Sequence, residues 1–348
     1  MGMSSGPQVR VFIGSIGRRV YLIRWFVEAF ERLGIDGQLH VSDADARSAG
    51  MLSSSFRHVV PRYEDAGYSD AMAQTFEAVR PHLFFSVNDY EIEALATTGL
   101  AARLEEHGTV VLSLATDRHA AIHDKYAMSV ELRRYGVPTP ETVPLSHFDE
   151  ALDLATRAQD VIVKERCGSG SSGLEKLTST EFISRMQMRD GGWPQWSSSE
   201  RVVQPLLSGV EFGLDIVSPV LPDAHATGVL AREKLRMRAG ETDQAESVES
   251  EPFFEVATHL ARWLGHRGLV DVDVIVDDHG VQHVIDINPR FGGGYPFNHL
   301  AGADIPGLYV AQLVGHRGDA LGLFLNYASG VISSKFEAVV RDDQGVSS

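Results

Sequence analysis

The sequence is poor in the features that mark several common classes of protein. It holds one cysteine, Cys167, in 348 residues, which excludes an intrachain disulfide framework and a cysteine-rich zinc site. No apolar run approaches the roughly 20 residues that a membrane-spanning helix needs. Residues 1–7 lack the apolar core of a signal peptide. We therefore expect a cytoplasmic protein with no membrane partner.

Positive charge is also scarce. Lys and Arg total 31 against 47 Asp and Glu, which gives a formal net charge of −16. An extended nucleic-acid surface needs a basic stripe, so this balance argues against a nucleic-acid partner, whereas a local basic pocket for a small anion stays allowed. The apolar share of 43% and the charged share of 22% are ordinary for a globular protein. At roughly 150 residues per domain, the length suggests two or three domains.

The order of apolar and amphipathic stretches predicts a mixed α/β and α+β fold. The first third alternates strands at 9–13, 37–42, 83–87 and 110–112 with helices at 19–33, 68–79 and 92–106, as in an open parallel sheet of Rossmann type. A helix at 120–135, a strand at 141–144, a helix at 148–158 and a strand at 160–164 follow. Later strands are expected at 201–207, 211–218, 226–230, 270–276 and 281–287, with a helix at 255–264, and residues 236–251 are expected to form a mobile loop. We divide the chain into a Rossmann-like domain (1–113), a small α+β domain (114–200) and a larger antiparallel α+β domain (201–348).

The most informative local feature is the predicted hairpin at 270–287. Strand side chains alternate in direction, so Asp271 and Asp273 share one face of its first strand, and Asp286 and Asn288 share one face of its second. Pairing through the four-residue turn puts all four on a single face. Three crowded carboxylates repel unless a hard cation neutralises them, and Mg²⁺ favours this oxygen set. Arg290 can reach the same face; the alternative is a solvated polar face of an edge hairpin.

A Gly/Ser loop follows the strand at 160–164. Gly168, Gly170 and Gly173 allow close backbone approach. Their amides, with the intervening serine hydroxyls, can hold phosphate oxygens, and Lys164 stands directly before the loop. The pattern differs from a P-loop because no Lys-Ser/Thr follows the glycines, and a flexible linker is the alternative.

The turn after the first strand allows three interpretations. Gly14-Ser-Ile-Gly17 lacks the full dinucleotide-binding spacing, although Asp43 ends the second strand where a ribose-binding acid would sit. NAD binding, a plain strand–helix turn and a bound substrate anion all stay open. The anion would be held at the start of the helix by Ser15, Arg18 or Arg19.

Two further polar clusters stand out. One is basic, with four positive side chains in seven residues: Arg232, Lys234, Arg236 and Arg238. It is either a solvated charge run or a holder of a γ-phosphate and a second substrate beside the metal. The other lies at the carboxyl edge of the first sheet, where open α/β sheets bind ligands, and comprises Asn88, Asp89 and Glu91.

Taken in order along the chain, these motifs resemble the ATP-grasp enzymes, and within them the carbamoyl phosphate synthase large-subunit-like and amino acid ligase-like branch. The segments that carry the resemblance are Lys125 in His-Asp-Lys-Tyr-Ala-Met, Lys164 with the Gly/Ser loop, Gln204-Pro-Leu-Leu-Ser-Gly-Val-Glu211, Asp273, and Asp286-Ile-Asn-Pro-Arg290. Three more look like features of that branch: the Gly14–Leu22 segment, the Arg238–Asp243 segment and the Arg290–Pro296 segment. The resemblance covers nearly the whole chain and rests on the ordered set, because no single motif is specific.

The resemblance implies an ATP-grasp fold in which a small and a larger domain clamp ATP beside an N-terminal pre-grasp domain. It implies that ATP is bound by Lys125, Lys164, Ser169, Gly170, Ser171, Ser172, Gln204, Leu206, Leu207 and Glu211, of which the serine loop is a lid and the leucines contact adenine through backbone groups. Asp273, Asp286 and Asn288 would hold two Mg²⁺ ions, or Mn²⁺. The catalytic residues would be Arg290, Arg238 and Lys234, and the substrate would contact Ser15, Arg18, Asp89, Glu91, Arg236 and Gly293. The family usually has Glu at the position of Asp286 and commonly an acid at Pro205.

The implied chemistry is ATP-dependent ligation of a carboxylate and an amine. Transfer of the γ-phosphoryl group makes an acyl phosphate, and the amine then displaces phosphate to leave an amide and ADP. The partners would be small-molecule substrates, an amino acid or a small peptide by analogy, and a homodimer is allowed. The alternatives are a catalytically weak nucleotide-binding or regulatory protein and, with less support, an NAD(P)-dependent oxidoreductase.

Overall fold

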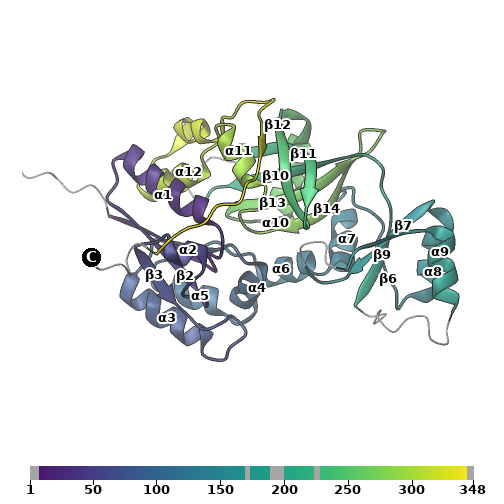
Figure 1. Cartoon of the computed structure of the whole chain (residues 1–348), viewed down its shortest axis with the longest axis horizontal. Helices are drawn as coiled ribbons and strands as arrows, with labels where there is room; N and C mark the ends of the chain where they lie inside the picture. Colours follow the sequence, from purple (N-terminus) through teal and green to yellow (C-terminus); the bar gives the residue numbers. More distant parts are fainter. Residues whose placement is uncertain (1–7, 169–172, 189–199, 223–227, 343–348) are drawn as a thin grey trace, which may run out of the picture.

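The computed structural model describes residues 8–168, 173–188, 200–222 and 228–342, and it places three sheets side by side (Figure 1). The first sheet is parallel, in the order β3-β2-β1-β4-β5. Its strands are β1 (Val9–Gly14), β2 (Gly37–Asp43), β3 (Phe56–Val59), β4 (Leu83–Ser86) and β5 (Val110–Val111), and its helices are α1 (Val20–Leu33), α2 (Ala49–Leu52), α3 (Tyr68–Val79), α4 (Asp89–Thr97) and α5 (Leu100–Glu105). The expected Rossmann-like arrangement is confirmed.

The small sheet lies at the far end of the molecule, beyond two connecting helices (Figure 1). Its order is β6-β9-β7-β8 and its described pairs are antiparallel. Its elements are β6 (Val143–Pro144), α8 (Phe148–Arg157), β7 (Asp160–Glu165), β8 (Glu175–Thr178), α9 (Ser179–Gln187) and β9 (Arg201–Pro205). Helices α8 and α9 cover the sheet, and they share a small apolar core with it that includes Val161, Val163 and Phe182.

The large sheet is antiparallel, in the order β14-β13-β10-β11-β12-β15. Its strands are β10 (Val210–Ser218), β11 (Gly228–Arg238), β12 (Glu241–Val248), β13 (Gly268–Val276), β14 (Gln282–Asn288) and β15 (Ile332–Ser334). The helices of this part are η1 (Glu251–Phe253), α10 (Phe254–Leu264), α11 (Tyr295–Leu300), α12 (Ile305–Leu313) and η2 (Gly318–Leu325). After β15 the chain runs across α1 towards β3, where Arg57 pairs with Asp342 (Figure 1).

Three expectations about local structure are wrong. The helix expected at 120–135 is two helices, α6 (Thr116–His123) and α7 (Lys125–Arg134), because the Asp124 side chain accepts hydrogen bonds from the Tyr126 and Ala127 amides and starts a new helix. The helix expected at 92–106 is likewise divided into α4 and α5, at Gly99, whose φ is 73°.

The third correction concerns residues 236–251, which were expected to form a mobile loop. They belong to an ordered hairpin of β11 and β12. The strands meet at Ala239 and Gly240, whose φ angles of 50° and 80° match a two-residue hairpin turn with both central residues left-handed. The polar composition hid the strands because the hairpin projects beyond the apolar core and carries charge on both faces.

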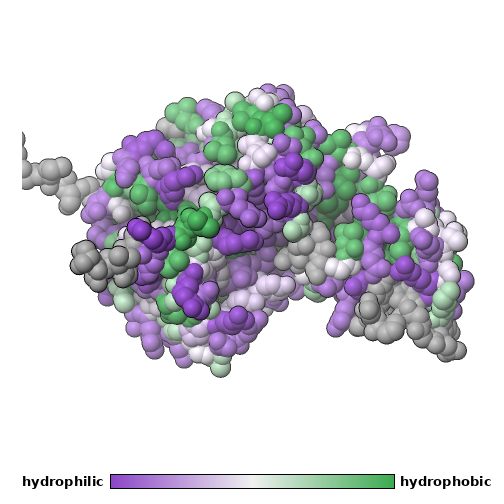
Figure 2. Space-filling view, in the orientation of Figure 1, coloured by the Kyte–Doolittle hydropathy of each residue, from purple (hydrophilic) through white to green (hydrophobic). Residues whose placement is uncertain are grey.

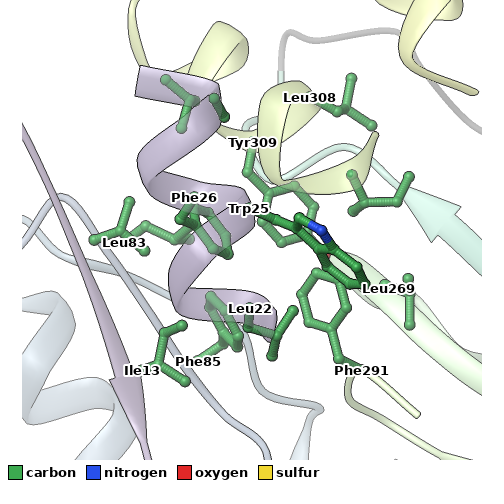
Figure 3. Packing of buried hydrophobic residues seen from close by; sticks show 14 of the residues in the cluster. Ile13, Leu22, Trp25, Phe26, Leu83, Phe85, Leu269, Phe291, Leu308 and Tyr309 are labelled. Atoms are coloured by element: carbon green, nitrogen blue, oxygen red, sulfur yellow. The ribbon is translucent and has the colours of Figure 1, made fainter. Parts of the chain in front are cut away.

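One apolar core joins the first sheet to the large sheet. Trp25 and Phe26 of α1 pack with Leu308 and Tyr309 of α12, and with Phe291 from the end of the large sheet (Figure 3). A second core lies between the large sheet, α10 and the connecting helices, and it includes Ile122, Met128 and Leu132. The domain boundaries at 113 and 200 stay an interpretation, since α6 and α7 contribute to the core of the large sheet.

No helix in the described part of the chain is long and apolar enough to cross a membrane.

Candidate functional site

A cavity of about 690 Å³ lies between the small sheet and the large sheet. Apolar side chains line one part of it, among them Ile162, Leu206, Leu207, Ile275 and Ile285. Charged and polar groups line the rest, among them Lys125, Lys164, Glu211, Lys234, Asp273, Asp286, Asn288 and Arg290. Residues that the sequence places far apart are thus brought together in one cavity. The space-filling view shows hydrophilic residues gathered over the middle of the molecule, where the first part of the chain meets the large sheet (Figure 2).

The distribution of lysine is the clearest chemical signal in this cavity. The chain has five lysines, and four of them line the cavity: Lys125, Lys164, Lys176 and Lys234. The fifth, Lys335, bonds to Glu241, which also lines it. A protein with a net charge of −16 has therefore placed its ammonium groups around one concave surface. Such a surface favours a multiply charged anion.

The polar face predicted for the hairpin is present. Strands β13 and β14 pair with Asp273 opposite Asp286 and Asp271 opposite Asn288. The register shifts directly after Asp273, so that β14 carries a bulge at Ile285. Strict alternation along β14 would turn Ile285 away from Asp286, but with this bulge both residues line the cavity, and the buried residues of β14 are Val284 and Ile287.

The carboxylates on this face are strongly coupled to lysine. The Lys234 ammonium lies 2.6 Å from Asp273 Oδ1 and 2.7 Å from Glu211 Oε1. Burial, together with the nearby charges of Asp271 and Asp286, raises the pKa of Asp273 to about 7, although Lys234 opposes this. Asn288 Nδ2 donates to Asp286 Oδ2 at 3.1 Å. Concentrated negative charge of this kind is relieved when a divalent cation is bound.

The donor set fits a magnesium site that is completed by other oxygen ligands. In the described ranges no three His, Cys, Asp or Glu side chains converge on a common point. Asp271, the third acid of the predicted face, turns instead to Arg232. Asp273, Asp286 and Asn288 therefore offer two carboxylates and an amide. Mg²⁺ commonly binds through one or two carboxylates plus waters and substrate phosphates, so these three side chains would hold it against a nucleotide.

Two lysines face the metal-binding side chains from the small sheet and from α7. Burial and the charge of Lys125 lower the pKa of Lys164 to about 8, while Asp286 and Asp273 act in the opposite direction. Lys125 Nζ donates to the Gly168 carbonyl oxygen at 2.7 Å. Lys125 is held at the start of α7 by its amide, which donates to the Arg166 carbonyl. The start of the Gly/Ser loop is thus fixed to the beginning of α7. Ser169, Gly170, Ser171 and Ser172, predicted to bind ATP, lie outside the described residues.

The predicted hinge lies at the apolar end of the cavity. Gln204 is buried and its Nε2 donates to Thr142 Oγ1 at 2.6 Å. The Leu206 amide donates to the Asp160 carbonyl, so this backbone donor is already used within the small sheet. Leu206 and Leu207 both line the cavity with apolar side chains. This end can accept a flat apolar group such as a purine ring.

Arg290 lies at the opposite, polar end and is held by the first part of the chain. Its Nε and Nη2 contact the two carboxylate oxygens of Asp89 at 2.6 and 2.7 Å. Its Nη2 also lies 3.4 Å from Asn288 Oδ1. Despite burial, the Asp89 carboxylate keeps the pKa of Arg290 above its ordinary value. Asp89 does not line the cavity itself, but it fixes the orientation of an arginine that does.

A buried ion network lies beneath the metal-binding face, and composition alone gave no sign of it. Arg232 is 1% exposed and bonds to Asp215 at 2.7 Å and to Asp271 at 2.5 Å. A Cβ atom on Gly213 would lie 2.8 Å from the Arg232 guanidinium, so glycine is needed there for close approach. The network pairs Asp271 with Arg232, which leaves Asp273, Asp286 and Asn288 as the ligand candidates on this face.

Several predicted residues are not brought to the cavity. Glu91 is buried and accepts a hydrogen bond from Tyr68 at 2.5 Å and another from Ser86. Ser15 bonds to Glu91, and Arg18 is exposed. Arg236 bonds to Asp243, and Arg238 lies at the hairpin tip, 71% exposed and 3.8 Å from Glu337. Gly293, in contrast, lines the cavity.

The structure gives the turn after β1 a different partner from a dinucleotide. The Asp43 carboxylate accepts a hydrogen bond from the Gly17 amide at 2.8 Å and another from Ser48 at 3.2 Å. The acid that would bind ribose in an NAD site therefore closes the turn itself. This geometry favours the two other interpretations of the turn.

Comparison with known proteins agrees with the geometry of the cavity. Residues 122–294 match the family model described as "ATP-grasp domain". A carbamoyl phosphate synthase large chain from Thermomicrobium roseum is 24% identical over 209 residues, which are 57% of this chain and 19% of that protein. The chain therefore spans about a fifth of the length of this relative.

Solved structures show the same fold at low identity. The biotin carboxylase domain of 2-oxoglutarate carboxylase from Hydrogenobacter thermophilus, solved with MgADP, ADP and bicarbonate, has a TM-score of 0.67 at 15% identity, covering 89% of this chain and 70% of that one. An L-amino acid ligase from Bacillus licheniformis has a TM-score of 0.63 at 16% identity, covering 88% and 74%. These structures show a shared fold, and the family match shows that residues 122–294, which carry most of the cavity-forming strands, belong to the ATP-grasp domain family.

Proposed function

We propose that the protein is an ATP-dependent carboxylate–amine ligase that forms an amide through an acyl phosphate and releases ADP and phosphate. The observation that carries this proposal is the single cavity in which four of the five lysines face Asp273, Asp286, Asn288 and Arg290. The apolar end suits adenine, and the polar end suits the phosphates and the reacting groups.

The residues of the cavity would have different roles in the reaction, according to their chemistry. Mg²⁺, held by Asp273, Asp286 and Asn288, would supply neutralisation of the phosphate charge. Lys164 and Lys125 would bind phosphate oxygens from the side of the small sheet. Arg290 would stabilise the charge that develops on the transferring phosphoryl group, since a preorganised cation in a dry cavity is most effective there. Asp89 would keep its planar fork in place.

Lys234 would occupy a different position in the mechanism from that of Lys164. Its ammonium bonds to Asp273 and Glu211, and its side chain lies almost completely inside the protein. A phosphate or a metal ion at Asp273 would compete for this lysine. We infer that Lys234 turns from Asp273 to the nucleotide when ATP binds. The same lysine would then neutralise Asp273 before ATP binds and the phosphates afterwards.

The substrate is proposed to be an amino acid or a small peptide, because the L-amino acid ligase shares the fold and because the cavity lining includes further charged side chains, Arg19 and Glu241. The decisive assay incubates the purified chain with ATP, Mg²⁺ and pairs of amino acids, and measures ADP. Carboxylate labelled with ¹⁸O should deliver label to phosphate. Stoichiometric AMP would contradict the proposal.

A further inference from the structure

The polar end of the cavity has a wall that the proposed ATP and metal sites do not use. Arg19, at the start of α1, lines this wall with Glu241 of β12 and Gly293. Arg19 Nη1 donates to the Tyr21 hydroxyl at 2.7 Å. In the described ranges Tyr21 is the one hydrogen-bond partner recorded for this guanidinium. Its remaining N–H groups are therefore available to a ligand.

Positive charge predominates at this wall. Glu241 Oε2 is 2.9 Å from Lys335 Nζ, and this hydrogen bond is the main cause of the lowered pKa of Glu241. The charges of Arg19 and Arg18 lower that pKa further, so both arginines lie close to it. One carboxylate thus faces three cations. The excess charge favours an anionic ligand over an ammonium group.

Tyr21 holds the Arg19 side chain in place. Burial raises the pKa of the Tyr21 hydroxyl, so this hydroxyl keeps its proton. The neutral hydroxyl oxygen accepts from Arg19 Nη1 and so positions the guanidinium without neutralising its charge. The planar fork of a guanidinium held in this way suits the two oxygens of a carboxylate.

Gly293 lines the cavity beside this wall. A Cβ atom there would lie 3.4 Å from Lys335 Nζ and 3.6 Å from Glu241 Oε2, so a side chain at this position would lie against the charged groups of the wall. Gly293 lies three residues after Arg290, and both line the same cavity as Arg19. The charge of Arg290 also acts on the Tyr21 hydroxyl, so a small molecule held by Arg19 lies in the part of the cavity that contains Arg290.

We propose that Arg19, positioned by Tyr21, binds the carboxylate of the amine substrate, which makes that substrate an amino acid rather than a simple amine. The inference rests on the proposed ligase function. The carboxylate that becomes phosphorylated belongs at Arg290 and the metal, so a second carboxylate site is needed only if the nucleophile carries its own. Lys335, held by Glu241, adds long-range attraction.

The test compares amine substrates with and without a free carboxylate. Each L-amino acid that supports ADP release with the purified chain is assayed against its α-carboxamide, with MgATP saturating. The native protein should prefer the free acid by about 10-fold or more in kcat/KM, since a site built around a charge-assisted contact rejects an analogue that lacks it. In Arg19→Gln the preference should fall to within about 3-fold, and KM for ATP should change less than about 2-fold.

Matched variants separate recognition from structure. Tyr21→Phe should reduce the preference in part, and Arg19→Lys should restore it poorly because a point charge lacks the planar fork. Arg24→Gln is the control, since Arg24 lies on the same helix and is 63% exposed to solvent. Equal use of acid and amide by the native protein, or an unchanged preference in Arg19→Gln, would overturn the inference. Loss of the preference in Glu241→Gln with Arg19→Gln unaffected would also overturn it, because selection for the free acid would then depend on Glu241 and not on Arg19.

A binding experiment distinguishes failure of this inference from failure of the ligase proposal. If no amino acid pair supports ADP release, the proposed function fails. Free amino acids are then titrated calorimetrically into the protein with Mg²⁺ and a non-hydrolysable ATP analogue. Binding that Arg19→Gln abolishes and Arg24→Gln retains supports the carboxylate site, whereas no binding of any amino acid contradicts it.

Discussion

At the residue scale, the fold places acidic and basic side chains in contact inside the cavity, so that the ionisation of each depends on the charge of the other. The buried Lys234 side chain contacts the partly buried Asp273, and burial raises the pKa of the acid to about 7 while its partner lysine opposes that rise. Such a pair is poorly solvated, so it does not stabilise the free protein strongly. It does provide groups that exchange partners when a more highly charged ligand enters.

We predict that Asp286→Ala abolishes Mg²⁺-dependent ADP release while the protein stays folded. Asp286 bonds to Asn288 on the cavity face and makes no contact that the apolar core requires. Asp278→Ala is the matched control, because Asp278 is an exposed acid in the turn of the same hairpin. Asp286→Glu should retain activity if the longer side chain reaches the same metal position. Activity in Asp286→Ala, or in excess chelator, would remove the metal site from the mechanism.

We predict that ATP affinity falls as the pH rises through about 8 to 9. Burial and Lys125 lower the pKa of Lys164 to about 8, so in the free protein this lysine loses its charge in that window. Phosphate binding favours the charged form, and ATP binding should therefore take up protons above pH 8. Calorimetry in buffers of different ionisation enthalpy measures the uptake.

Two variants test the assignment to Lys164. Lys164→Met should weaken ATP binding at pH 7 by about 1–3 kcal/mol, the usual range for a charge-assisted contact, and should flatten the pH dependence. Lys164→Arg keeps its charge throughout this range and should also show no decline from pH 8 to 9. A decline of native size in either variant would assign the titration to another group.

At the element scale, the hairpin of β11 and β12 contributes charged side chains to the cavity from both of its strands. Strand β11 supplies Arg232 and Lys234 at its base, and β12 begins with Glu241 and Thr242, which line the cavity. The four basic residues of β11 therefore differ in how far they are exposed to solvent. Arg232 and Lys234 are buried, whereas Arg236 and Arg238 are largely exposed near the tip.

We predict that Gly240→Val destabilises this hairpin and raises KM for the amine substrate. The φ of Gly240 is 80°, which a β-branched residue adopts only at a cost of about 1–3 kcal/mol. The displaced turn would move Glu241 and with it Lys335. Ala239→Gly is the control, because Ala239 has a φ of 50° and glycine removes strain there. Urea unfolding and steady-state kinetics measure the two effects, and native stability in Gly240→Val would contradict the turn geometry.

The sequence predicted the parts of the site that depend on local pattern. Strand alternation placed Asp273, Asp286 and Asn288 on one face, and the pairing of Asp273 with Asp286 confirms that arrangement. The bulge at Ile285 could not be predicted, since a strand with one extra residue shows no distinct composition. The Arg290–Asp89 contact joins residues 201 positions apart, so only the tertiary fold reveals it.

Two other features have a signal in the sequence that hydrophobic periodicity alone does not reveal. The start of α7 is marked by Asp124 before Lys125, an ordinary N-cap signal inside what looked like one continuous helix. The scarcity of lysine was also visible: with five in the whole chain, their positions already outlined the cavity. The burial of Arg232 depends on glycines at 213 and 294, from separate segments, and needed the structure.

At the scale of the whole molecule, the first sheet does not have a core of its own on both faces. Its outer face is covered by α3 and α5, with Phe12, Phe76 and Phe84 packed together. Its inner face is covered by α1, and the apolar side of α1 continues onto α12 (Figure 3). Trp25 stacks on His299 and meets Tyr295 edge to face, both from α11. The Arg19 wall and the Arg290–Asp89 contact therefore lie where the first part of the chain meets the large sheet, and a continuous apolar core joins these two parts.

We predict that residues 8–112 cannot fold stably without the C-terminal helices, and that the full chain loses the first and large sheets in one transition. Removing α11 and α12 would expose Trp25, Phe26 and Leu22 on one side of α1, and each large apolar side chain contributes about 1.5–3 kcal/mol when buried. The fragment should bind a hydrophobic dye and lack near-ultraviolet circular dichroism, as expected for a loosely packed state.

In the full chain, Trp25→Ala should lower the free energy of unfolding by about 3–5 kcal/mol. It should reduce the hydrogen-exchange protection of the first and large sheets together. Val27→Ala, an exposed change on the same helix, should have little effect. A cooperative unfolding transition in the isolated fragment would show that the first sheet is an independent domain, and the orientation of Arg19 and Asp89 towards the cavity would then depend on domain motion rather than on a shared core.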